Sequence, residues 1–162
     1  MKCVMCDNKK SLKKEVVTLR YNECGLNNVV LAGVIKHSCP ECGEEYFNYG
    51  NIEQLHSLIK TALIVKKDLL TGSEIRFLRK QMGFSKEFFA HVLGVEIRTV
   101  FRWESNKNIT KQVDRSIRMA ASLKEPDRDY KFHEQLLDDT KSKKYKLMKI
   151  KVTGKQPHLD LV

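Results

Sequence analysis

Cys39-Pro40-Glu41-Cys42-Gly43 repeats the spacing of Cys3-Val4-Met5-Cys6, and 32 residues separate the two Cys-x-x-Cys turns. Each turn brings two sulfur atoms close enough to share one metal ion, and two turns complete a tetrahedron of thiolates. The rigid proline and the permissive glycine of the second turn suit a metal knuckle, because backbone amides must turn toward sulfur there. The predicted ligands of one structural Zn²⁺ are Cys3, Cys6, Cys39 and Cys42.

Two other uses of cysteine are less consistent with this sequence. Disulfides need an oxidising compartment, and a thioredoxin-like redox site needs a single Cys-x-x-Cys in a βαβ context. Neither is indicated here. Cys24 falls outside both turns, and we expect a free thiol there rather than a fifth ligand. We expect His37 to be a strand residue.

The segment between the cysteine turns has the composition of two strands. Residues 15–21 and 28–38 are rich in β-branched or apolar side chains, and Gly25 and Asn27 mark a turn between them. We therefore predict a zinc-binding β-hairpin over residues 1–49, with a knuckle at each end.

The net charge of +10 is concentrated in the middle of the chain. Residues 1–48 carry seven Lys and Arg against six acidic residues, residues 49–124 carry fourteen against seven, and residues 125–162 carry nine against seven. Four thiolates on one Zn²⁺ would change the first segment from +1 to about −1. A nearly neutral head beside a basic body favours different partners for the two parts. The alternative is that surface lysine only keeps the protein in solution.

Residues 50–70 are expected to form a connecting helix of about five turns. Asn51 is placed to cap its start. The apolar side chains at close to helical spacing are Ile52, Leu55, Leu58, Ile59, Ala62, Leu63, Val65 and Leu69. Such a stripe could cover the core of either part or join two subunits.

Residues 71–124 carry the signals of four shorter helices. Thr71 and Glu74 have the form of a capping box, and Gly83 ends the first helix. Ser85 caps the second helix and Gly94 ends it. The residues expected to face inward from these two helices are Ile75, Leu78, Met82, Phe88, Phe89, Ala90 and Leu93.

A third helix is predicted over residues 96–104 and a fourth after Thr110. Val100 and Trp103 are expected in the core, with Arg98 and Arg102 on the opposite, exposed face. The fourth helix would bury Val113, Ile117, Ala120 and Ala121.

These residues carry a resemblance to known proteins. Four segments of the body resemble the helix-turn-helix of Xre-type regulators. They are Leu70-Thr71-Gly72-Ser73-Glu74-Ile75-Arg76, residues 85–90, Gly94-Val95 and Thr99-Val100-Phe101-Arg102-Trp103-Glu104. With the cysteine turns before them, residues 1–124 resemble the MqsA (YgiT-type zinc finger) family of antitoxins. The resemblance implies an α+β protein in which a β-hairpin zinc head is joined by a helix to an all-α, lambda-repressor-like domain.

The third helix would enter the major groove of DNA, where arginine can donate two hydrogen bonds to guanine. Arg98 and Arg102 lie one turn apart, and Arg102 matches an arginine that reads bases in the family. Arg98 stands where a family member has asparagine, so we expect a different operator. Phe101 could pack on a thymine methyl group, or belong to the core or a dimer seam. The predicted base contacts are Arg98, Thr99, Phe101 and Arg102.

Phosphate contacts would position the protein on DNA without reading its sequence. The candidates are Ser85, Lys86, Lys107, Lys111 and Arg115.

The tail over residues 125–162 carries weaker patterns. Residues 130–140 could form a short acidic helix, and residues 145–152 alternate in part, as a strand with one lysine-rich face would. A disordered basic arm is the alternative reading.

The resemblance implies a homodimeric repressor that binds a palindromic DNA operator and, through its zinc head, a cognate toxin. A regulator without a toxin and a zinc-dependent protein adaptor are the alternatives. We expect no enzyme, because no nucleophile stands beside a base and four thiolates leave a metal no open position. The sequence contains no apolar run of about 18 residues and no signal-peptide pattern, which predicts a cytoplasmic protein without a membrane span.

Overall fold

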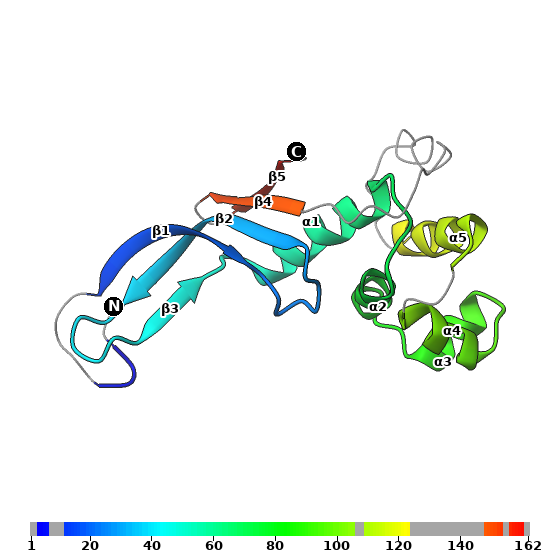
Figure 1. The fold of residues 1–162 in the computed structure, drawn as a ribbon, viewed down its shortest axis with the longest axis horizontal. Coiled ribbons are helices and arrows are strands. Elements are labelled where there is room, and N and C mark those ends of the chain that lie inside the picture. Colours follow the sequence, from blue (N-terminus) through cyan, green and yellow to red (C-terminus); the bar gives the residue numbers. More distant parts are fainter. Residues whose placement is uncertain (1–2, 7–11, 106–108, 124–147, 154–155, 161–162) are drawn as a thin grey trace.

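A computed structural model describes residues 3–6, 12–105, 109–123, 148–153 and 156–160. Figure 1 shows an elongated molecule with a twisted sheet at one end, a long helix against it, and a group of shorter helices at the other end. The described part contains one sheet and five helices, so the predicted α+β class is confirmed.

The predicted hairpin is formed by β1 (Lys13–Arg20) and β2 (Val29–Ser38), which pair antiparallel. Gly25 lies in the turn between them with a φ of 80°, a left-handed conformation that favours glycine. A third strand, β3 (Glu45–Asn48), pairs antiparallel with the second half of β2 and was not predicted. The head is therefore a small sheet centred on β2 rather than a hairpin alone.

Part of the tail joins the same sheet. Strand β4 (Met148–Thr153) pairs in parallel with the first half of β2, and β5 (Gln156–Asp160) pairs antiparallel with β4. Ile150 is fully buried in the main hydrophobic cluster. The strand predicted over residues 145–152 is thus observed from Met148 onward, whereas the predicted helix over residues 130–140 lies outside the described residues.

The connecting helix, α1 (Ile52–Val65), starts as predicted and ends early. Asn51 Oδ1 accepts from the backbone N–H of Gln54 at 3.1 Å, which confirms the cap. The prediction of a helix continuing to residue 70 was wrong, because the backbone of Lys66 leaves the helical conformation with ψ 132°.

A buried arginine of α5 (Lys111–Ser122) explains this early end. The Arg118 guanidinium donates to the backbone carbonyl oxygens of Leu63, Ile64, Lys66 and Asp68. The last carbonyls of a helix have no partner inside it, so this side chain caps α1 from another element. Asp114 accepts from Arg118 Nε at 2.7 Å and from the backbone N–H of Leu70 at 2.7 Å, which also fixes the segment after the helix.

The remaining helices of the body are α2 (Gly72–Gln81), α3 (Lys86–Val92) and α4 (Ile97–Glu104). The predicted caps at Thr71, Ser85 and Thr110 are confirmed, including the reciprocal capping box of Thr71 with Glu74. The prediction that Phe88 faces inward was wrong: its side chain is 50% exposed, while Phe89 is fully buried.

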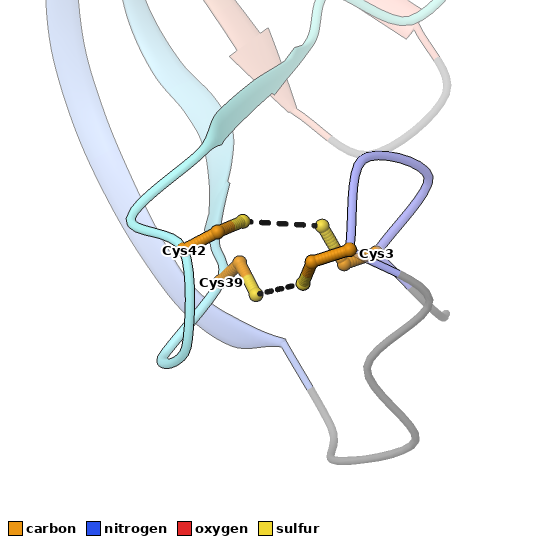
Figure 2. A group of neighbouring side chains, drawn as sticks. Cys3, Cys39 and Cys42 are labelled. Atoms are coloured by element: carbon orange, nitrogen blue, oxygen red, sulfur yellow. Dashed lines mark hydrogen bonds between the residues drawn. The ribbon is translucent and has the colours of Figure 1, made fainter.

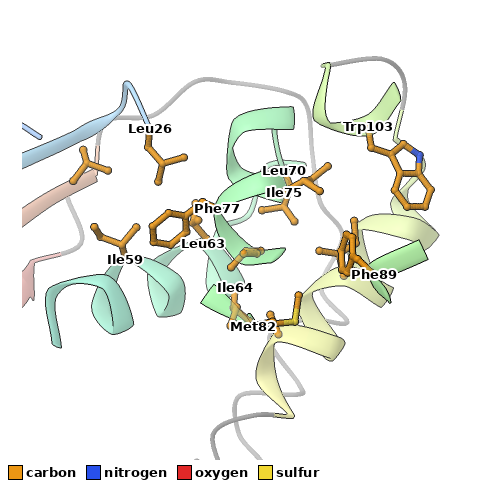
Figure 3. Packing of buried hydrophobic residues seen from close by; sticks show 14 of the residues in the cluster. Leu26, Ile59, Leu63, Ile64, Leu70, Ile75, Phe77, Met82, Phe89 and Trp103 are labelled. Carbon is orange, nitrogen blue, oxygen red and sulfur yellow. The ribbon is translucent and has the colours of Figure 1, made fainter. Parts of the chain in front are cut away.

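One hydrophobic cluster extends from the sheet into the body. Figure 3 shows Leu26 and Ile59 at one end of this packing and Phe89 and Trp103 at the other, with Leu63 between them. Close packing of this kind transmits a shift in one element to its neighbours. Among the helices that the structure describes, none has the length and apolar character needed to cross a membrane.

Candidate metal centre and nucleic-acid interface

The four predicted metal ligands come together beyond the carboxyl end of β2. Cys39 directly follows β2, and Cys42 lies in the turn before β3. Gly43 has a φ of 75°, and its N–H donates to the carbonyl oxygen of Cys39 at 3.0 Å. Figure 2 shows the sulfur atoms of Cys39 and Cys42 facing the loop that carries Cys3.

The distances between the sulfur atoms suit a tetrahedral metal site. Sγ of Cys3 lies 3.6 Å from Sγ of Cys42, and Sγ of Cys6 lies 3.6 Å from Sγ of Cys39. All four sulfur atoms lie within 4.8 Å of one another. A Zn–S distance of about 2.3 Å in a tetrahedron places neighbouring sulfurs about 3.8 Å apart. The four cysteines can therefore hold a metal ion, and the group contains neither Cys24 nor His37.

Tyr46 of β3 is the neighbour of this cluster that sequence reasoning missed. Its hydroxyl lies 3.4 Å from Sγ of Cys3 and accepts from the N–H of Val4 at 3.3 Å. Hydrogen bonds lower the pKa of the Cys3 thiol to about 6, and the one with Tyr46 contributes most. Because the thiolate is the form that binds metal, the tyrosine favours the ligating state. No sequence pattern marks this residue, since it depends on the unpredicted β3.

Polar contacts cross from the head to the body at two places. Nδ2 of Asn28, which directly precedes β2, donates to Oε1 of Glu74 in α2 at 3.2 Å. The Lys66 ammonium binds the other oxygen of the same carboxylate at 2.8 Å. Glu74 is fully buried, so these partners balance a charge that is removed from water.

His56 of α1 makes the second set of polar contacts between the head and the body. Its Nε2 lies 3.1 Å from the Tyr21 hydroxyl, and its Nδ1 lies 3.3 Å from Nε2 of Gln81 in α2. The ring also packs edge-on against Phe77, with centroids 5.8 Å apart. Burial lowers the pKa of His56, so the neutral ring is favoured at this seam.

The helix predicted to read DNA, α4, has two distinct faces. Val100, Trp103 and Glu104 are buried. Arg98 and Arg102 are exposed. These two arginines are four residues apart on a regular helix, so they lie on the same outward face. Of the other predicted base contacts, Thr99 is half-buried and Phe101 is 48% exposed.

A buried carboxylate connects α4 to α2. Glu104 Oε1 accepts from Arg79 Nε at 2.6 Å, and its Oε2 accepts from Arg76 Nε at 3.3 Å. Arg79 also donates to the carbonyl oxygen of Phe84 at 2.7 Å. This network fixes the orientation of α4 relative to α2. Sequence analysis missed it, because the partners are more than 20 residues apart and share no local pattern.

The candidate phosphate contacts occupy several elements. Ser85 caps α3, and its Oγ accepts from the N–H of Phe88 at 3.1 Å. Lys86 begins α3 and contacts Phe101 of α4, with its ammonium 3.8 Å from the ring centroid. Lys111 is exposed at the start of α5 and Arg115 is half-buried on the same helix. Lys107 lies outside the described residues.

Comparison with known proteins agrees with this arrangement. The sequence model of a family described as the antitoxin component of bacterial toxin-antitoxin systems, MqsA, matches residues 1–124. Searches of curated proteins and of solved structures found no match. The matched segment includes the cysteine cluster and all of α1 to α5. The chain therefore belongs to the MqsA family of antitoxins.

Proposed function

We propose that this antitoxin is a homodimeric DNA-binding repressor whose helical body reads a palindromic operator and whose zinc-bound head engages the cognate toxin. The observation that carries the DNA-binding part is the outward pairing of Arg98 and Arg102 on α4. The opposite face of the same helix is anchored in the core by Val100 and Trp103.

The anchoring supports base reading because it limits movement of the helix. Glu104 at the end of α4 is fixed by Arg79, so the helix is held by apolar contacts and by a buried ion pair. In helix-turn-helix docking the second helix enters the major groove while the first crosses the DNA backbone. Here α3 and α4 take these two positions, with Arg98, Thr99 and Arg102 as the base-reading side chains.

A homodimer is favoured by the small size of this surface. One short helix makes few base contacts, so tight specific binding needs two copies on half-sites about one helical turn of DNA apart. Ser85, Lys86, Lys107, Lys111 and Arg115 are the proposed phosphate contacts, which would make the affinity depend strongly on salt.

The head is assigned to the toxin because its composition suits protein better than DNA. With one Zn²⁺ on four thiolates, the first 48 residues carry a net charge of about −1. The structure separates this end from α4 along the long axis of the molecule (Figure 1). A tetrahedral four-thiolate site has no open position for catalysis, so the zinc would stabilise the fold of the head.

Titration of metal-loaded protein with the DNA upstream of its gene tests the DNA-binding proposal. Replacing Arg102 by alanine should weaken binding to the specific site by about 1–3 kcal/mol, or roughly five- to 150-fold, for each half-site that loses its arginine. Metal content should not change, because Arg102 lies on α4. Arg20→Ala, an exposed arginine of β1, is the matched control and should bind like the wild type. Unaltered specificity in the Arg102 variant would refute the assignment.

The toxin part has its own test. The full chain is co-expressed with the product of the adjacent gene and purified through a tag on that product. Capture of the wild type, together with loss of capture in a Cys39→Ser/Cys42→Ser variant that still binds DNA, supports the division of roles. Equal capture of both proteins would show that the metal-bound head is not the toxin-binding part.

A further inference from the structure

We propose that Phe101 is a positioning residue, which holds the ammonium group of Lys86 for contact with a DNA phosphate and does not read a thymine. This inference rests on the proposed DNA-binding function. It concerns the contact between α3 and α4, the two helices that would face the DNA, and the backbone phosphate is the partner group.

The contact itself is well defined. Lys86 is the first residue of α3, and its Nζ lies 3.8 Å from the centroid of the Phe101 ring. An ammonium group over an aromatic face is attracted by the electrons of the ring. Phe101 immediately precedes Arg102, one of the two arginines proposed to read bases. The lysine charge is therefore held beside the base-reading surface by a residue of the reading helix.

The surrounding charges leave Lys86 available for a phosphate. Its Nζ lies 3.9 Å from Oε2 of Glu104, whereas Arg79 and Arg76 contact that carboxylate at 2.6 and 3.3 Å. Three cations thus surround one carboxylate, and Lys86 is the most distant of them. Its side chain is 29% exposed, so its ammonium can still meet a group from the solvent side.

The aromatic contact also reduces the freedom that Lys86 would lose on binding. A lysine side chain has many rotamers, and ordering it costs part of the interaction energy. Packing on Phe101 restricts these rotamers before DNA arrives. Because the first helix of a helix-turn-helix crosses the DNA backbone, a cation fixed at the start of α3 is placed for a phosphate contact.

The same contact competes with base reading by Phe101. To read a thymine, the ring must pack on the 5-methyl group in the major groove. A ring that carries an ammonium group on one face has only its edge and its other face left for a base. The Lys86 ammonium covers part of the Phe101 ring, and the side chain remains 48% exposed.

The test compares full-length, metal-loaded variants in titrations of the specific DNA at several salt concentrations. A homodimer on a palindromic operator carries two copies of Lys86, so replacing it by methionine removes two phosphate contacts and should make the slope of log K against log salt shallower by about 1.8. At about 0.15 M salt this corresponds to an affinity loss of roughly 30-fold. Phe101→Leu keeps an apolar side chain without the ring, and should lower the affinity in the same direction.

Two further variants separate positioning from direct reading. Phe101→Leu combined with Lys86→Met should bind no more weakly than Lys86→Met alone, because the ring would act only through the lysine. Phe101→Tyr keeps an aromatic face and should bind like the wild type. Additive losses in the double variant, or no recovery with tyrosine, would overturn the proposal.

Operator DNA with uracil in place of thymine removes the methyl groups and tests the competing role. Equal wild-type affinity for both DNAs is expected, whereas a loss on uracil DNA that disappears in Phe101→Leu would overturn the inference. Binding that requires Arg102 but keeps its full salt slope in Lys86→Met would overturn only this inference. Absence of DNA binding, or binding that ignores Arg102→Ala, would overturn the proposed function and the inference together.

Discussion

At the cysteine end of the head, Cys3, Leu12 and Cys39 form a buried cluster of three residues, with Tyr46 packed against it. The helical body instead shares a large cluster that extends from Leu26, in the connection between β1 and β2, to Ala121 in α5. Burying one leucine-sized side chain stabilises a fold by about 1.5–3 kcal/mol, so three residues cannot replace such a core. The comparison indicates that apolar packing maintains the body, whereas the cysteine end would depend on a metal ion held by its four thiolates.

Removing two metal ligands should have the largest effect, and it acts on the cysteine end of the head. A Cys39→Ser/Cys42→Ser variant should lose its metal, with an expected free-energy cost on the order of 10 kcal/mol, as for other structural zinc sites. The residues around the cysteine cluster should unfold, while α1 to α5 keep their helical circular dichroism. Metal analysis and amide hydrogen exchange would measure the two parts separately.

Cys24→Ser is the control for this experiment, since Cys24 donates to the carbonyl oxygen of Tyr21 and is not part of the metal group. It should keep a full equivalent of metal. Loss of the helical signal in the Cys39→Ser/Cys42→Ser variant would show that the body depends on the metal as well.

Arg118→Met should have the next largest effect, and it acts on the body. The substitution leaves the buried carboxylate of Asp114 without its cation and the last carbonyls of α1 without their donor. Removing one partner of a buried ion pair typically costs about 3–5 kcal/mol. Urea denaturation of the metal-loaded protein would measure this loss, and metal content should stay at the wild-type level.

Arg98→Met serves as the matched control, because the same change on the exposed face of α4 should alter stability by less than about 0.5 kcal/mol. If Arg118→Met denatured at the same urea concentration as this control, the hydrogen bonds from Arg118 to the end of α1 would contribute nothing to stability.

The smallest expected effect concerns His56, which lies between the head and the body, and the dependence of stability on pH. Burial lowers the pKa of His56, so the unfolded chain takes up a proton at a higher pH than the folded protein does. The stability contributed by neutral His56 is therefore present above the unfolded pKa, about 6.5, and is lost as the pH falls through and below that value. Urea midpoints measured from pH 7.5 to 5.5 should decline less in His56→Gln than in the wild type.

His91→Gln changes an exposed histidine of α3 and should leave the pH dependence as in the wild type. An equal decline in His56→Gln and the wild type would show that protonation of His56 does not weaken the seam.

Local signals predicted much of this fold. The cysteine spacing identified the ligand cluster, and the caps at Asn51, Thr71, Ser85 and Thr110 marked helix starts that the structure confirms. These features depend on residues within a few positions of one another, so they can be recognised in the sequence alone.

The errors arose where distant segments decide the outcome. The end of α1 depends on Arg118, more than 50 residues later, and Ile64 is fully buried although it lay outside the predicted apolar stripe. Phe88 and Phe89 are equally apolar, and only their packing shows that Phe89 enters the core while Phe88 contacts Phe84 at the surface. The ion pairs of Glu104 were unpredictable for the same reason.

The parallel pairing of β4 with β2 has a consequence for how the protein is made. Val29 in β2 pairs with Met148, more than a hundred residues later in the chain. A ribosome therefore synthesises the cysteine turns and helices α1 to α5 before it completes the strand that carries the buried Ile150. The sheet of the head can reach its final form only late in translation, after the segments on which the body depends have already emerged.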